Sequence, residues 1–157
     1  MKSKRRLFLK GATSAGLIGV AVGAGLLKPV RVLAAAWPKT AFDADTTAAA
    51  MTEMFGSTEA AESGDIKVKA PDIAENGAVV PVTVETGLSS VESISIITEN
   101  NPAPLSASFN LASNAEGYVS TRLKMGKTSK VVALVKADGK LYSASKEVKV
   151  TIGGCGG

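Results

Sequence analysis

The residue with the most distinctive chemistry in this sequence is Cys155, the only cysteine among 157 residues. It stands between two pairs of glycines at the C-terminus, in the order Gly153-Gly154-Cys155-Gly156-Gly157. A buried structural cysteine is packed by neighbouring side chains, whereas four flanking glycines supply none. We therefore expect an exposed thiol on a thin, flexible arm that can enter the cleft of a partner.

No neighbouring group is predicted to activate this thiol. Cations and helix N-termini favour the thiolate of reactive cysteines, but the nearest basic residue in the sequence is Lys149, and the terminal carboxylate disfavours a second negative charge. An unactivated thiol is mostly protonated at neutral pH. We infer that Cys155 is an attachment point on which partner enzymes act, and that the protein is not itself an enzyme.

The remaining composition offers little other chemistry. The chain has no histidine, which excludes imidazole general bases, Ser-His or Cys-His dyads and His-ligated metals. Methionines beside Phe55 could form a soft-metal site with Cys155, but methionine at helical spacing usually packs in a core. Solvated surface charge explains the acids in predicted strand edges and turns, among them Asp72, Glu75 and Glu85. We expect no catalytic residue, no metal and no cofactor.

The first 36 residues predict an export signal. They contain seven Lys or Arg and no acid, with a basic start, an apolar stretch over 11–27 and Ala34-Ala35-Ala36 as a cleavage site. The pair Arg5-Arg6, followed by Leu-Phe-Leu-Lys, resembles the twin-arginine consensus, with Lys4 where Ser or Thr is usual. The apolar stretch is glycine-rich and shorter than the roughly 20 residues of a membrane span. We expect cleavage after Ala36, a periplasmic location and no stable membrane association.

Without this leader, residues 37–157 keep 11 Lys or Arg against 14 Asp or Glu, a net charge of −3. The basic balance of the whole chain therefore belongs to the leader, and no basic stripe remains for binding nucleic acid. The 121 residues after the leader suit one domain with a hydrophobic core. We expect a signal over 1–36, a helix and linker over 37–63, a β-sandwich over 64–152 and a carrier arm over 153–157.

The spacing of apolar residues predicts one short helix followed by strands. Residues 46–55 carry apolar side chains at helical spacing, with Asp43 or Asp45 as a cap and Gly56 as the stop. Beyond Gly64 the pattern changes to seven short β-branched runs, which indicates an all-β fold, an antiparallel sandwich. The predicted strands are 66–69, 78–86, 91–98, 105–111, 118–125, 130–137 and 141–152.

Turn residues support this order. Asp138-Gly139 between two alternating runs predicts a type I′ hairpin, and the stretch 101–104, Asn-Pro-Ala-Pro, predicts an extended connection. Pro81 cannot donate to a ladder and predicts that its strand lies at a sheet edge or a bulge. The last strand is expected to alternate, with Val148, Val150 and Ile152 inward and Lys149 and Thr151 outward. It should hold the chain up to Ile152, which places Cys155 about 10 Å beyond the sheet.

Four features resemble the SoxY family: the Gly-Gly-Cys-Gly-Gly end, the segments KAPDIAENGAVVPV at 69–82 and KADGKLYS at 136–143, and the twin-arginine leader. The resemblance covers essentially the whole chain. It implies an immunoglobulin-like sandwich and the sulfur carrier of periplasmic thiosulfate oxidation, paired with SoxZ as a heterodimer or higher oligomer. It further implies that the haem protein SoxXA loads thiosulfate onto Cys155. SoxB then releases sulfate, and SoxCD oxidises the remaining sulfur or it is stored.

Three other interpretations of the C-terminus compete with a carrier. An unpaired cysteine in an oxidising compartment also forms intermolecular disulfides, so a structural subunit bridged through Cys155 is the alternative. A ubiquitin-like use of the terminal Gly156-Gly157 requires cytoplasmic nucleotide chemistry, which an exported protein would not meet. A prenyl anchor requires three residues after the cysteine, and here two follow.

Overall fold

The computed structural model describes residues 37–151. The twin-arginine pair Arg5-Arg6, the end of the last predicted strand at Ile152, and the tail 153–157 with Cys155 lie outside the described residues. Two short helices precede the strands: α2 (Lys39–Phe42) and α3 (Thr47–Phe55). The strands are β1 (Ala61–Glu62), β2 (Ile66–Lys69), β3 (Ile73–Ala74), β4 (Val80–Thr86), β5 (Val91–Thr98), β6 (Leu105–Asn110), β7 (Tyr118–Leu123), β8 (Ser129–Ala137) and β9 (Lys140–Val150).

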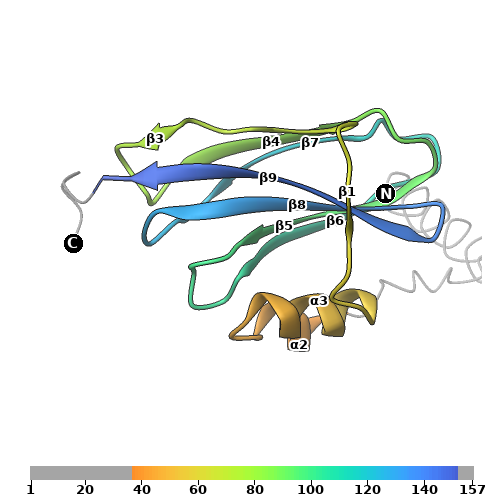
Figure 1. Ribbon diagram of the computed structural model, residues 1–157, viewed down its shortest axis with the longest axis horizontal. Coiled ribbons are helices and arrows are strands. Elements are labelled where there is room, and N and C mark those ends of the chain that lie inside the picture. Colours follow the sequence, from red (N-terminus) through yellow and green to blue (C-terminus); the bar gives the residue numbers. More distant parts are fainter. Residues whose placement is uncertain (1–36, 152–157) are drawn as a thin grey trace, which may run out of the picture. The chain divides into compact units, whose positions relative to one another are not determined.

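The strands form two sheets (Figure 1). The larger sheet has the order β1-β9-β8-β5-β6, with β3 also paired to β9, and the smaller has the order β2-β4-β7. Two facing sheets with a shared core are the architecture of an immunoglobulin-like sandwich, so the predicted fold class is confirmed. All seven predicted strands are present. The structure adds β1 and β3, which have two residues each and pair parallel to β9, so the sandwich is not purely antiparallel.

The main core lies between the two sheets. Alternate residues of β4 point inward, so that Val80, Val82 and Val84 are fully buried, while Pro81 between them is exposed. They pack against the inward residues of the larger sheet, including Ile94 of β5. The smaller sheet therefore has one buried face and one more exposed face.

The larger sheet is covered on both faces. Its outer face packs against α2 and α3 (Figure 1), in a second core of Ala41, Ala50, Met51, Ile97, Leu105 and Leu134. Burial from both sides explains why β5 is buried without interruption from Ser93 to Thr98. Met54 and Phe55 also pack on this core, so the interpretation of these side chains as core packing is confirmed.

Helix α3 begins one residue later than its cap prediction implies. The N-cap is Thr46, whose hydroxyl accepts a hydrogen bond from the Ala49 backbone N–H at 3.1 Å, and not Asp43 or Asp45. Asp43 is instead the C-cap of the additional helix α2 and pairs with Lys39. The predicted stop is confirmed, because Gly56 ends α3 with a φ of 73°.

The turn predictions have mixed outcomes. Asp138 and Gly139 have φ values of 48° and 70°, as a type I′ hairpin requires. The Asn-Pro-Ala-Pro stretch connects β5 to β6, but it bends after a turn in which the Asn101 backbone N–H donates to the Thr98 carbonyl at 3.1 Å, so the predicted extended connection is wrong. The edge prediction for Pro81 is wrong for the strand as a whole, because β4 is the middle strand of its sheet. However, β2 runs beside Thr83–Thr86 only, so Pro81 lies in the part of β4 that has β7 as its single neighbour.

Candidate functional site

The candidate site is the carboxyl end of β9, where the chain leaves the sandwich. Thr151 is the last described residue, and Cys155 follows four residues later in the sequence. Cys155 and the glycines around it are outside the described residues, so the structure shows the anchor of the tail and not the thiol. Val148 is fully buried, Lys149 is exposed and Val150 is partly buried, which confirms the predicted alternation up to this point.

The last residues of β9 are held from both sides although β8 does not reach them. The β8–β9 ladder starts where Ser129 pairs with Val148. On the opposite side, the backbone N–H of Lys149 donates to the Asp72 carbonyl at 2.9 Å, and that of Thr151 donates to the Ala74 carbonyl at 3.1 Å. On the β8 side, the N–H of Val150 donates to the Thr128 hydroxyl at 3.0 Å.

Two asparagines fix the loop that carries Thr128. The Asn100 side-chain amide donates to the Thr128 carbonyl at 2.8 Å, and the Asn100 backbone N–H donates to the Ser129 hydroxyl at 3.0 Å. The Asn101 amide donates to the Lys124 carbonyl at 2.8 Å. The β5–β6 connection therefore fixes the β7–β8 loop, which in turn contacts the end of β9.

The segment that contains β3 is held against β9 by a lysine. The Lys146 ammonium donates to the Ala70 carbonyl at 2.6 Å and lies 2.9 Å from a carboxylate oxygen of Asp72. The hydrogen bond and charge of Lys146, with a smaller effect of the Lys149 charge, hold the pKa of Asp72 below its usual value. The Asp72 side chain is 88% exposed, so the pair is a surface contact that adds to the backbone bonds of β3.

Gly77 allows the turn before β4 to pack directly on the end of β9. A Cβ atom at this position would lie 2.3 Å from the Met125 carbonyl oxygen and 2.9 Å from a methyl group of Val150. The Met125 backbone N–H also donates to the Gly77 carbonyl at 2.7 Å. Three segments distant in sequence thus meet at Gly77, and only a residue without a side chain fits between them.

Two large apolar side chains at this end of the sandwich are exposed. Ile73 in β3 is 57% exposed and Val79, just before β4, is 52% exposed. Ile73 is paired in register with Lys149. The anchor of the tail is therefore bordered by apolar as well as charged surface.

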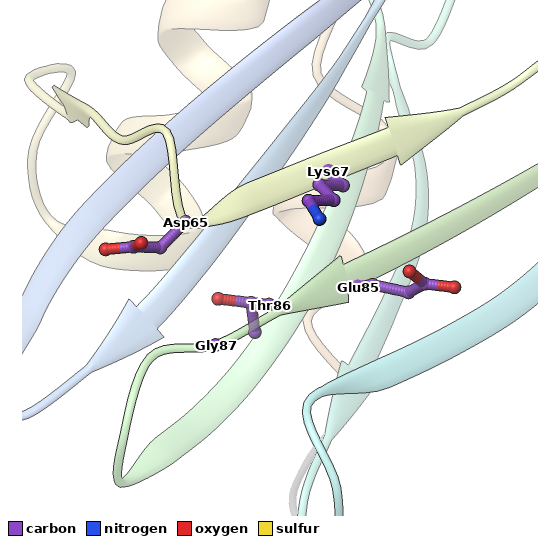
Figure 2. A pocket seen from close by; sticks show the side chains of 5 residues that line it. All are labelled: Asp65, Lys67, Glu85, Thr86 and Gly87. Atoms are coloured by element: carbon purple, nitrogen blue, oxygen red, sulfur yellow. The ribbon is translucent and has the colours of Figure 1, made fainter.

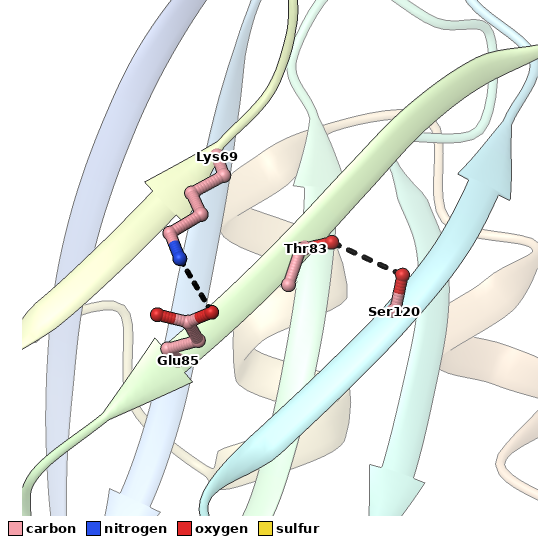
Figure 3. A network of polar contacts seen from close by, with 4 residues as sticks. All are labelled: Lys69, Thr83, Glu85 and Ser120. Atoms are coloured by element: carbon pink, nitrogen blue, oxygen red, sulfur yellow. Dashed lines mark hydrogen bonds and ion pairs between the residues drawn. The ribbon is translucent and has the colours of Figure 1, made fainter.

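The outer face of the smaller sheet carries polar side chains but no comparable site. A shallow pocket there is lined by Asp65, Lys67, Glu85, Thr86 and Gly87 (Figure 2). On the same face Lys69 pairs with Glu85 at 2.6 Å, and the hydroxyls of Thr83 and Ser120 are 3.0 Å apart (Figure 3). Glu85 is partly exposed and paired with Lys69, which agrees with its interpretation as surface charge.

Within residues 37–151 there is no group of three or more acidic, cysteine or histidine side chains that could hold a metal ion. Over the same residues no helix has the length and apolar character of a membrane span.

Sequence reasoning missed Thr128, Asn100 and Lys146, which hold the tail anchor. The sequence carried one signal near them, the Asn101-Pro102 pair, because Asn before Pro is typical of a turn. No pattern indicated which residues these side chains contact.

A protein-family model and several solved structures are similar to this chain. The chain matches the family model "Sulfur oxidation protein SoxY" over residues 51–155. The solved structure of the sulfur carrier protein SoxY from Chlorobium limicola f thiosulfatophilum is 50% identical with a TM-score of 0.60, covering 66% of this chain and 94% of that chain. A superoxide reductase (neelaredoxin) from Ignicoccus hospitalis is 23% identical with a TM-score of 0.49, covering 55% of this chain and 80% of that chain. A search of curated proteins found no match.

The family match and the Chlorobium structure agree with the observed fold. The matched region begins in α3, includes every strand of both sheets and extends to Cys155. Half of the aligned residues are identical to those of the Chlorobium protein. This chain therefore belongs to the SoxY family of sulfur oxidation proteins.

Proposed function

We propose that this protein is a periplasmic carrier that binds thiosulfate-derived sulfur covalently on Cys155 and presents it to the Sox enzymes. The observation that carries the proposal is that the family match extends to the only cysteine of the chain. The 50% identical Chlorobium protein is described as a sulfur carrier protein. A carrier of this kind requires one accessible thiol and no catalytic group of its own.

The chemistry follows from a single thiol. Loading joins the Cys155 sulfur to the outer sulfur of thiosulfate, and the new S–S bond releases one proton and two electrons. The electrons pass to an acceptor on the loading enzyme, which we assign to the haem protein SoxXA. Water then attacks the terminal sulfonate in SoxB, releasing sulfate and one proton and leaving a persulfide on Cys155. SoxCD oxidises this persulfide, or its sulfur is stored.

The described anchor supports this use of the tail. Because β9 is held as far as Thr151, Cys155 lies at most about 13 to 14 Å from the sandwich, at ~3.3 to 3.6 Å per residue. That distance is enough to enter a cleft while the body stays outside. Glycines on both sides of the cysteine keep the tail narrow and open to backbone conformations that other residues rarely adopt. Ordering such a tail costs entropy, which favours transient docking with several enzymes over one tight complex.

Mass spectrometry of the intact protein, isolated without reductant from cells oxidising thiosulfate, tests the proposal. We expect adducts of sulfur or thiosulfate on Cys155. A disulfide-linked dimer as the sole species would instead support the structural alternative, because an odd exported cysteine commonly pairs between chains.

We further propose that the protein crosses the membrane in complex with a partner that has no leader of its own, which we assign to SoxZ. The twin-arginine route transports folded proteins, and within 37–151 no metal-binding cluster explains a need to fold first. Changing Arg5-Arg6 to Lys-Lys should therefore leave both proteins in the cytoplasm. Immunoblots of periplasmic fractions provide the measurement, and a partner that still reaches the periplasm would contradict joint export.

A further inference from the structure

The β9 strand continues beyond its antiparallel neighbour, and a side chain replaces the missing strand. Successive backbone N–H groups of β9 point to opposite neighbours. Those of Val148 and Val150 point toward β8, and those of Lys149 and Thr151 point toward the β3 segment. The β8–β9 pairing begins at Ser129 and Val148, so no residue of β8 lies opposite Val150. The Thr128 hydroxyl accepts the Val150 N–H at 3.0 Å, where a continued strand would have offered a backbone carbonyl.

The position of this hydroxyl is set by the structure around it. The Thr128 carbonyl accepts from the Asn100 amide at 2.8 Å, and the adjacent Ser129 hydroxyl accepts from the Asn100 backbone N–H at 3.0 Å. Ser129 is 2% exposed and is the first residue of β8. Although Thr128 is exposed, its backbone is therefore held on the C-terminal side of the Cα atom, next to the point from which its hydroxyl reaches β9.

We propose that Thr128 is a positioning residue that sets where the C-terminal tail begins. With the hydroxyl present, the last N–H groups of β9 have partners on both sides and the tail starts after Thr151. Without it, the Val150 N–H must bond to water, and the end of β9 opens more often, back toward Val148. The segment that carries Cys155 then lengthens from four residues to about seven. The expected effect on sulfur transfer rests on the proposed carrier function, whereas the expected opening of the end of β9 does not.

A longer segment lowers the effective concentration of the thiol at a docked active site. This concentration falls roughly as the −3/2 power of segment length, so opening to Val148 lowers it about twofold. Loss of a single exposed hydrogen bond should also speed hydrogen exchange of the Val150 amide about three- to tenfold. The two effects are measured by independent methods.

The test compares the full protein with Thr128→Val, which keeps the shape but removes the acceptor, and Thr128→Ser, which keeps the hydroxyl. Thr83→Val is the matched control, because it removes a hydroxyl contact with Ser120 on the other sheet (Figure 3). The readouts are amide exchange at Val150 and the nitroxide spectrum of a spin label on Cys155. We expect faster exchange and a more mobile label in Thr128→Val only, with Thr128→Ser and Thr83→Val like the wild type.

Unchanged exchange and label mobility in Thr128→Val, or an equal change in Thr83→Val, would overturn the positioning role. A further measurement is the kcat/KM of SoxXA for each carrier, expected to fall by at most about twofold in Thr128→Val, the limit for a fully opened strand end, and to recover in Thr128→Ser. If the wild type accepts no thiosulfate at all, the carrier function fails, while the exchange and label results still decide the role of Thr128.

Discussion

Replacing Cys155 with serine is expected to abolish sulfate formation from thiosulfate in a reconstituted Sox system. A serine hydroxyl cannot form the S–S bond that holds the intermediate, and no second cysteine exists to replace the first. We therefore expect a loss to the background rate and not a partial reduction. Sulfate released per carrier, measured by ion chromatography over a time course, provides the result.

The matched control tests whether a thiol is sufficient or must also stand at the end of the tail, away from the sandwich. Adding Thr151→Cys to the Cys155→Ser variant returns one thiol to the exposed last described residue of the anchor, without the tail between. We expect this double variant to react with a small thiol reagent but to form no sulfate. Sulfate formation by Cys155→Ser alone would refute the carrier assignment, and sulfate formation by the double variant would refute the need for reach.

Changing Gly77 to alanine is expected to destabilise the domain by about 1 to 3 kcal/mol, the usual cost of adding a methyl group where no space exists. The new Cβ would lie 2.3 Å from the Met125 carbonyl oxygen and 2.9 Å from Val150, so backbone must move on at least one side. For a domain of this size the melting temperature should fall by about 4 to 12 °C. Thermal unfolding followed by circular dichroism measures it.

Gly64→Ala is the control for this substitution, because a Cβ there meets nothing within 4 Å. It should unfold within a degree or two of the wild type, since it removes backbone freedom without adding a clash. Equal melting temperatures for Gly77→Ala and the wild type would show that the turn moves away from β9 at no cost. The close contact would then have no role in holding the anchor.

The parts of the fold that sequence predicts well are those fixed by local chemistry. Asp138-Gly139 specifies a type I′ hairpin because both residues accept positive φ, and the alternation of Val148, Lys149 and Val150 in β9 follows from one buried face. Gly56 ends α3 for a similar local reason. Each of these signals lies within a few residues of the feature that it determines.

The errors arise where distant segments decide the outcome. The neighbours of Pro81 depend on how far β2 runs beside β4, and the sequence around Pro81 cannot show this. Strands β1 and β3 are two residues long, too short for any periodic pattern, and exist because β9 offers an edge to them. Likewise Thr128 looks like an ordinary loop residue until β9 is seen to extend past β8.

The parallel pairing of β3 with the end of β9 gives the anchor a mechanical property. In the proposed carrier function, an enzyme that withdraws from the tail would pull along the axis of β9, while the bonds from Lys149 and Thr151 to the β3 segment run across that axis. Bonds that run across the axis share a force along it. The β3 segment would therefore oppose withdrawal of β9 from the sandwich when a docked partner departs.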